Sequence, residues 1–108
     1  MFHPFEFWTE TATGTNAGAT ATKAAAAGRE HFVDQISGFT DADSLIQIIN
    51  EATTVLWEIK IVVASNGQGF AINIPGGVHS GIAGQTLAGK IVSSTAACRV
   101  NISGHTVP

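Results

Sequence analysis

The side chains best suited to acid–base or metal chemistry are the four histidines, but their spacing matches no ligand motif. His3, His31, His79 and His105 are spread over the whole chain, whereas two-histidine metal motifs place their ligands a few positions apart. We interpret them as separate histidines at the surface or the rim of the fold. The sequence therefore predicts no metal site and no catalytic histidine pair.

Two other fragments of known motifs are incomplete. Asp41 and Asp43 have the Asp-x-Asp spacing that opens a calcium loop, but the central glycine and the later oxygen ligands do not follow. We interpret both aspartates as part of a turn. Gly67-Gln-Gly69 lacks the third glycine and the following helix of a dinucleotide-binding fingerprint, so we predict no cofactor.

The candidate nucleophiles also lack the context that a catalytic residue needs. Cys98 is the only cysteine, which excludes an intrachain disulfide and a cysteine-based zinc site. It alternates with Val100 and Ile102, a pattern that indicates a buried, unreactive thiol. Ser80 and Ser103 precede glycines but lack the Gly-x-Ser-x-Gly elbow of serine hydrolases. We therefore predict no catalytic residue and a protein that is not an enzyme.

The residues that stand out are aromatic. Phe2, Phe5, Phe7 and Trp8 lie among the first eight positions, ahead of a segment rich in threonine, alanine and glycine. Large aromatic side chains are frequent anchors of protein interfaces, so we predict that these four bind a partner. The alternatives are that this segment docks on a neighbouring copy or folds back over its own domain.

Composition narrows the possible partners. The chain has 108 residues, enough for one domain, and is 44% hydrophobic but only 12% charged. A net charge of −3 with five basic residues excludes binding to nucleic acid through phosphate neutralisation. The N-terminus lacks the basic and apolar regions of a signal peptide, and no apolar run is long enough to cross a membrane.

The elements that must position these residues are strands. Residues 1–14 are predicted to form an extended N-terminal arm, and residues 15–108 a β-sandwich domain. Within the sandwich, short alternating segments recur about every ten residues with turn signals between them, which predicts an all-β antiparallel sandwich of seven or eight strands. Residues 11–27 suit either a flat strand or an extended linker. The clearest strands are predicted at 31–39, 45–49, 54–63, 70–74, 86–92 and 96–102.

The segment 54–63 is the most strongly patterned. Trp57, Ile59 and Ile61 share one face of it, while Glu58 and Lys60 share the other. The Asn-Gly pair that follows at positions 66 and 67 favours a two-residue hairpin turn. We therefore predict that the strands at 54–63 and 70–74 form a hairpin.

Four segments carry a resemblance to a known class of protein. In order, they are Ala24-Ala-Ala-Ala-Gly-Arg-Glu-His31, Val55-Leu-Trp-Glu-Ile59, Phe70-Ala-Ile-Asn-Ile-Pro75 with the glycine-rich loop after it, and Val100-Asn-Ile-Ser-Gly-His-Thr-Val107. From Thr20 to the C-terminus this order resembles small virion proteins of tailed bacteriophages. The resemblance implies a jelly-roll sandwich and a non-enzymatic, oligomeric protein. The N-terminal aromatic segment lies outside it.

These observations lead to one expected function and two alternatives. We expect a capsid decoration (cement) protein, made in the host cytoplasm, that binds the major capsid protein on the outer capsid surface of the virion. We also expect copies of the chain to associate as a dimer or a trimer. One alternative is a head fibre, spike or tail component that binds host-surface glycans. The other is a cytosolic β-sandwich enzyme or ligand-binding module.

Overall fold

The computed structural model describes residues 6–15, 18–63, 67–92 and 97–108, and within them the chain forms eight β-strands. These ranges contain no helix that could span a membrane. The strands are β1 (Glu6–Thr15), β2 (Ala19–Lys23), β3 (Glu30–Thr40), β4 (Ser44–Asn50), β5 (Val55–Ile61), β6 (Gln68–Val78), β7 (Leu87–Val92) and β8 (Ala97–Val107).

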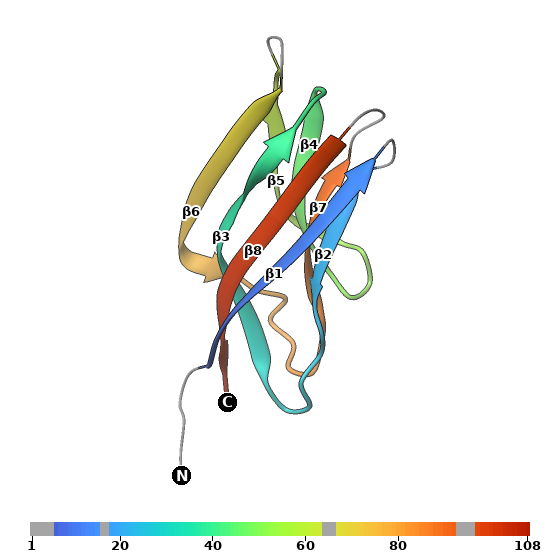
Figure 1. Ribbon diagram of the computed structural model, residues 1–108. Coiled ribbons are helices and arrows are strands. Elements are labelled where there is room, and N and C mark those ends of the chain that lie inside the picture. The colour runs from blue at the N-terminus through green and yellow to red at the C-terminus, as the bar shows by residue number, and fades with distance from the viewer. Residues whose placement is uncertain (1–5, 16–17, 64–66, 93–96) are drawn as a thin grey trace.

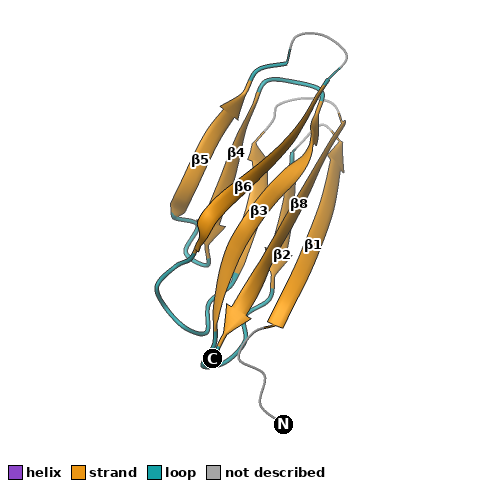
Figure 2. Ribbon diagram, turned by 90° about the vertical axis from the view of Figure 1, so that its left-hand side faces the viewer, coloured by secondary structure: helices purple, strands orange, loops and turns teal. Residues whose placement is uncertain are grey.

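The strands form two four-stranded antiparallel sheets packed face to face (Figures 1 and 2). The first sheet has the order β1-β8-β3-β6 and the second the order β2-β7-β4-β5. Only β4 and β5 are neighbours both in sequence and in a sheet, so the chain otherwise crosses between the sheets. This is the strand order of an eight-stranded jelly roll. The predicted all-β antiparallel jelly-roll sandwich is thus confirmed.

The core lies between the two sheets and is made of branched aliphatic side chains. Gly89 of β7 sets how closely the sheets approach, because a Cβ atom there would lie 2.3 Å from Cγ2 of Ile102 on β8. Alternation within each strand directs one side chain in two toward this layer. The buried core includes Val33, Ile36, Ile46, Ile48, Leu87, Ile91, Val100 and Ile102.

Residues 6–15 are not the separate arm expected from the sequence, because they form strand β1 of the sandwich. β1 pairs with β8 over its whole length, and Trp8 is in the core with only 9% of its surface exposed. Trp8 is the one large apolar residue in the inward register of β1, and near the end of the strand there is no room for a side chain: a Cβ atom on Gly14 would lie 1.7 Å from the carbonyl oxygen of Gly18. The expected boundary after residue 14 falls inside this strand, and residues 1–5 lie outside the described ranges.

The hairpin expected after residue 63 is also corrected. β5 belongs to the second sheet and β6 to the first, so the two strands do not pair. Residues 64–66 lie outside the described ranges. A two-residue turn would leave both strands in one sheet, whereas both have an apolar face that is covered only when they lie on opposite sides of the core. Burial of those faces therefore outweighs the local preference of the Asn-Gly pair.

Candidate functional site

The outward face of the first sheet carries a row of four rings across the strands. Phe7 on β1 lies opposite His105 on β8, which lies opposite Phe32 on β3. His79, directly after β6, stacks on the other side of Phe32. We call these four residues the aromatic row. It draws on four segments that are far apart in the sequence, so no local motif could reveal it.

The rings of the aromatic row contact one another in sequence. The Phe32 ring is nearly parallel to that of His105, at an interplanar angle of 8° and a centroid distance of 4.9 Å. On its other side Phe32 stacks on His79 at 4.4 Å and 26°. Phe7 is tilted by 51° against His105 at 6.3 Å. Phe7 is 79% exposed and so presents its ring to solvent at one end of the row.

Two carboxylates fix the orientation of the histidine rings. Asp34 Oδ2 lies 2.6 Å from His105 Nδ1, and Glu30 Oε2 lies 2.7 Å from His79 Nδ1. Because a carboxylate oxygen only accepts at neutral pH, each Nδ1 carries the hydrogen and donates it. Glu30 also accepts a hydrogen bond from the backbone N–H of Gly81 at 2.7 Å. Glu30 therefore ties the loop after β6 to β3.

A row of uncharged polar side chains lies beside the aromatic row. Thr9, Ser103, Gln35 and Asn73 are register partners across β1, β8, β3 and β6. We call them the polar row. The hydroxyls of Thr9 and Ser103 hydrogen-bond at 3.2 Å. All four side chains can both donate and accept hydrogen bonds.

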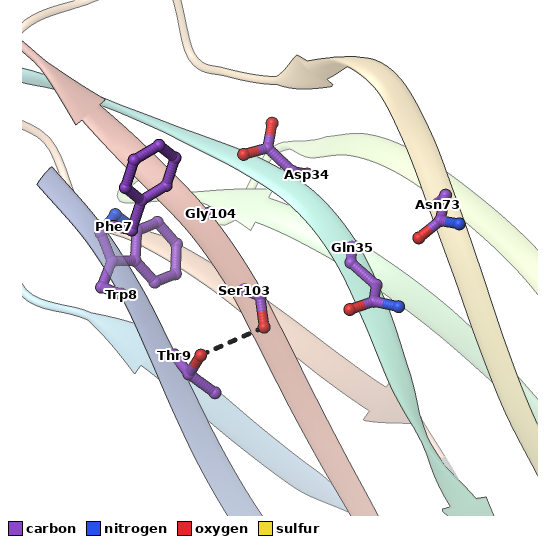
Figure 3. A pocket seen from close by; sticks show the side chains of 8 residues that line it. All are labelled: Phe7, Trp8, Thr9, Asp34, Gln35, Asn73, Ser103 and Gly104. Atoms are coloured by element: carbon purple, nitrogen blue, oxygen red, sulfur yellow. Dashed lines mark hydrogen bonds between the residues drawn. The ribbon is translucent and has the colours of Figure 1, made fainter. Parts of the chain in front are cut away.

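Phe7 and the polar row line one open groove, shown from close by in Figure 3. Its volume is about 570 Å³. Asp34 enters it because β3 has a register shift between Val33 and Gln35, which places a carboxylate beside two uncharged amides. The arrangement offers one apolar ring, several hydroxyl and amide groups and one carboxylate to a ligand. The complete lining is Phe7, Trp8, Thr9, Asp34, Gln35, Asn73, Ser103 and Gly104.

Below the groove, Trp8 is held by a buried hydrogen-bond network. Trp8 Nε1 donates to Thr106 Oγ1 at 3.0 Å, and Thr106 Oγ1 lies 2.6 Å from His31 Nδ1. His31 Nε2 lies 2.7 Å from the carbonyl oxygen of Ala24. A carbonyl can only accept, so Nε2 carries the hydrogen, and Nδ1 of the neutral ring accepts from the Thr106 hydroxyl. Every polar atom of this buried set is thereby paired.

The structure places Phe7 and Trp8, two of the four aromatic residues predicted to bind a partner, on opposite faces of β1. Phe7 is the exposed ring of the groove, whereas Trp8 faces the core and contacts the His31 ring edge to face at 5.9 Å. Trp8 is therefore not available as an anchor, because alternation along β1 sends neighbouring side chains to opposite faces. Phe2 and Phe5 lie outside the described residues.

Sequence reasoning missed the amide and carboxylate groups of the groove. Asp34 and Gln35 lie within the predicted strand at 31–39 and Asn73 within that at 70–74, and no local motif distinguishes them from other polar strand residues. Their outward alternation was visible, but their meeting in one place depends on the pairing order β1-β8-β3-β6. A local pattern does not specify that order.

Asp41 and Asp43, considered from the sequence as a metal-ligand pair, and Cys98, considered as a nucleophile, have structural roles. Asp43 Oδ1 accepts from the backbone N–H of Val63 at 2.8 Å, and Asp41 Oδ2 from that of Ala97 at 3.3 Å. Cys98 is buried, and this burial raises the pKa of its thiol. Over the described ranges, no three His, Cys, Asp or Glu side chains are grouped so that they could hold a metal ion.

Comparison with known proteins bears only on the fold. No family model matches the chain, and no curated protein matches it. Among solved structures, the CBM36-1 domain of a multidomain xylanase from the hindgut metagenome of Trinervitermes trinervoides is 15% identical, with a TM-score of 0.40 over 91% of this chain and 75% of that one. CsCBM6-3 from Clostridium stercorarium, solved in complex with cellobiose, is 13% identical, with a TM-score of 0.43 over 97% and 82%.

A third solved structure, a family 6 carbohydrate-binding module, is 17% identical, with a TM-score of 0.38 over 94% of this chain and 79% of that one. At these identities the likeness concerns the sandwich fold and not the ligand. The assignment of the fold rests on the strand order of this chain itself.

Proposed function

We propose that this chain is a non-enzymatic glycan-binding module and that the groove on the first sheet is its binding site. The observation that carries the proposal is the exposed Phe7 ring beside a continuous row of hydroxyl and amide side chains. A pyranose ring has one apolar face of C–H groups, which packs on an aromatic ring, and hydroxyl groups around its edge. Ser, Thr, Asn and Gln side chains match those hydroxyls because they both donate and accept.

The shape of the groove supports the same ligand class. It is open, and its lining residues come from all four strands of the first sheet, so it can receive one stretch of an extended chain whose ends continue into solvent. The groove presents one carboxylate, Asp34, already paired with His105. An uncharged or weakly cationic saccharide therefore suits it better than a polyanion. In the virion setting implied by the sequence resemblance, such a module would act in a head fibre, spike or tail component.

The test is isothermal titration calorimetry with the full chain and a panel of soluble oligosaccharides, followed by point variants. Phe7→Ala should weaken binding about fivefold, because one aromatic contact contributes about 1 kcal/mol. Gln35→Ala should weaken it as well. Phe39→Ala is the matched control, since Phe39 is an exposed phenylalanine on the same strand as Gln35 but outside the groove.

Two results would overturn this proposal. One is that no oligosaccharide or host-cell polysaccharide binds the correctly folded chain. The other is that Phe39→Ala weakens binding as much as Phe7→Ala does. A retained affinity in Phe39→Ala together with a loss in Phe7→Ala would place the saccharide in the groove.

A second candidate function, capsid decoration, is favoured by the exposed Phe7 ring on an edge strand. An exposed aromatic ring next to a weakly charged surface also suits a protein partner. We therefore retain the proposal that the chain binds the major capsid protein, with Phe7, Phe2 and Phe5 as anchors. The test is co-sedimentation with purified capsids: Phe7→Ala should release the protein, while saturating oligosaccharide should compete only if one surface serves both ligands. Unchanged sedimentation of a triple alanine variant would remove these anchors from the proposal.

A further inference from the structure

Strand β5 forms an edge of the second sheet and exposes apolar surface there. In the described chain it pairs only with β4. Ile59 at its centre is 38% exposed and Val55 at its start is 44% exposed. The edge of a strand carries unpaired N–H and C=O groups, and an exposed apolar edge is a template for pairing with another chain. An exposed edge strand of this kind either pairs with a strand of a partner or carries a feature that prevents such pairing.

We propose that β5 pairs antiparallel with β5 of a second copy, joining the second sheets of two molecules across a twofold axis. The axis passes through Ile59, so that Ile59 of one copy lies opposite Ile59 of the other. In this register Glu58 lies opposite Lys60 of the second copy, and Lys60 opposite Glu58. Trp57 likewise lies opposite Ile61. Opposite charges in directly facing positions stabilise an antiparallel pair.

The charges select this register over its neighbours. A shift by two positions one way places the two copies of Glu58 opposite each other, and a shift the other way does the same to Lys60. Like charges directly opposite one another destabilise a strand pair. A shift by one position fails for another reason, because it brings outward-facing residues opposite inward-facing ones and breaks the hydrogen-bond ladder. Of these registers, only the one centred on Ile59 avoids both faults, and it also pairs Glu58 with Lys60.

The surroundings of Glu58 and Lys60 agree with this pairing. Both residues are exposed. Glu58 Oε2 accepts a hydrogen bond from Gln47 Nε2 at 2.6 Å, which holds the carboxylate on the outward face of the sheet. The Lys60 ammonium forms no ion pair with any other residue in the part of the chain that the structure describes. A lone edge lysine would only keep strands apart, but here Glu58 supplies its complement from the second copy.

The side of the sandwich at β5 is also incompletely covered. β5 and β6 are the terminal strands of their sheets on this side (Figure 2). The inward-facing Trp57 and Ile61 of β5 are only half-buried. On β6 the same holds for Phe70, Ile72 and Ile74. A second copy placed against β5 covers apolar surface that the single chain leaves open to water.

The first test is the molar mass of the full chain in solution, measured by analytical ultracentrifugation from micromolar to millimolar concentration. The wild type should shift from monomer to dimer. Lys60→Glu and Glu58→Lys should each raise the dissociation constant on the order of tenfold or more, because each places two like-charged pairs across the axis. The double variant that carries both substitutions restores opposite charges and should dimerise as the wild type does.

Mixing the two single variants gives a sharper result. Each alone is expected to dimerise more weakly than the wild type. The Glu58→Lys strand is wholly basic and the Lys60→Glu strand wholly acidic at these positions, so an equimolar mixture should form heterodimers more readily than either variant forms homodimers. Thermal unfolding of each variant shows whether it is folded. A monomeric wild type at all concentrations, or equal dimerisation of wild type and single variants, would overturn the proposal.

Disulfide trapping tests the register itself. In a Cys98→Ala background, Ile59→Cys places two thiols directly opposite one another, so mild oxidation should yield covalent dimers. Ile61→Cys is the control on the same face, because in this register it lies opposite Trp57 and not opposite itself. Equal cross-linking of both variants, or of Ile61→Cys alone, would contradict the register.

Discussion

At the scale of single residues, the stability of the fold depends most on one atom of the buried hydrogen-bond network around Trp8. Thr106 Oγ1 is the junction of the network, since it accepts from Trp8 Nε1 and pairs with His31 Nδ1. Thr106 and His31 are almost fully buried, so water cannot replace a lost partner. The network therefore fixes the Trp8 ring under the groove, and with it the backbone that presents Phe7.

Thr106→Val tests this junction with little change in shape. The variant leaves the Trp8 N–H and the His31 Nδ1 without partners, and we expect a loss of about 1–3 kcal/mol in the free energy of unfolding. Thr13→Val on β1 is the control, because its hydroxyl is exposed and the same substitution there should change stability by less than about 0.5 kcal/mol. Urea denaturation measures both. Equal small effects would show that the network contributes little.

Cys98 gives a pH dependence whose direction follows from its burial. Burial chiefly raises the pKa of the thiol; a backbone hydrogen bond at Gly14 lowers it, and the charge of Asp41 raises it further. Because the folded-state pKa is higher than the unfolded one, the contribution to stability is intact below the unfolded pKa of about 8.5. It is lost as the pH rises from there through the folded pKa.

The corresponding experiment compares wild type with Cys98→Ala, which cannot titrate at this position. The difference in free energy of unfolding between them should stay constant from pH 6 to 8 and then shift against the wild type at higher pH. Denaturant titrations at each pH supply the values. A difference that does not change up to pH 10 would mean that the thiol ionises alike in the folded and unfolded chain.

At the scale of elements, the strands with strong alternation were predictable and β1 was not. Strands β5 and β8 could be predicted because large apolar side chains occupy their inward positions. The alternation is clear in the segment 54–63 and in Cys98, Val100 and Ile102. β1 has only Trp8 as a large apolar residue in its inward register. Glu10, Ala12 and Gly14 follow there, so the two faces of the strand show no contrast in hydrophobicity. The groove could not be predicted because it needs the order of four strands, which arises from burial of the whole sandwich.

Two neighbouring aromatic residues of β1, Phe7 and Trp8, should differ strongly in their contribution to stability. Trp8→Ala should lower the free energy of unfolding by about 3–5 kcal/mol, since it removes a large buried ring. Phe7→Ala should change it by less than about 0.5 kcal/mol, because that ring is mostly exposed. Differential scanning calorimetry distinguishes the two. A comparable loss from both variants would show that residue 7 also packs against the fold, and the exposed ring of the groove would lose its proposed role.

At the scale of the whole molecule, the two proposals combine into a geometric consequence. A twofold axis through Ile59, perpendicular to the joined second sheets, leaves both first sheets on the same side of the dimer. The two grooves then face in one direction and can reach one planar surface together. Two linked sites on a repetitive ligand bind more tightly than either alone, by a factor on the order of 10² or more where the geometry allows both to engage.

Binding to a polymeric glycan can therefore distinguish the contribution of the groove from that of the dimer interface. On a surface coated with a polymeric glycan, Lys60→Glu should be released much faster than the wild type, although its affinity for a short oligosaccharide is unchanged because residue 60 lies on the other sheet. The Glu58→Lys, Lys60→Glu double variant should regain slow release, and Phe7→Ala should lose both properties. Surface plasmon resonance measures release from the polymer and calorimetry the short ligand. Equal release of wild type and Lys60→Glu would mean that the two grooves do not engage one surface, even if the chain dimerises.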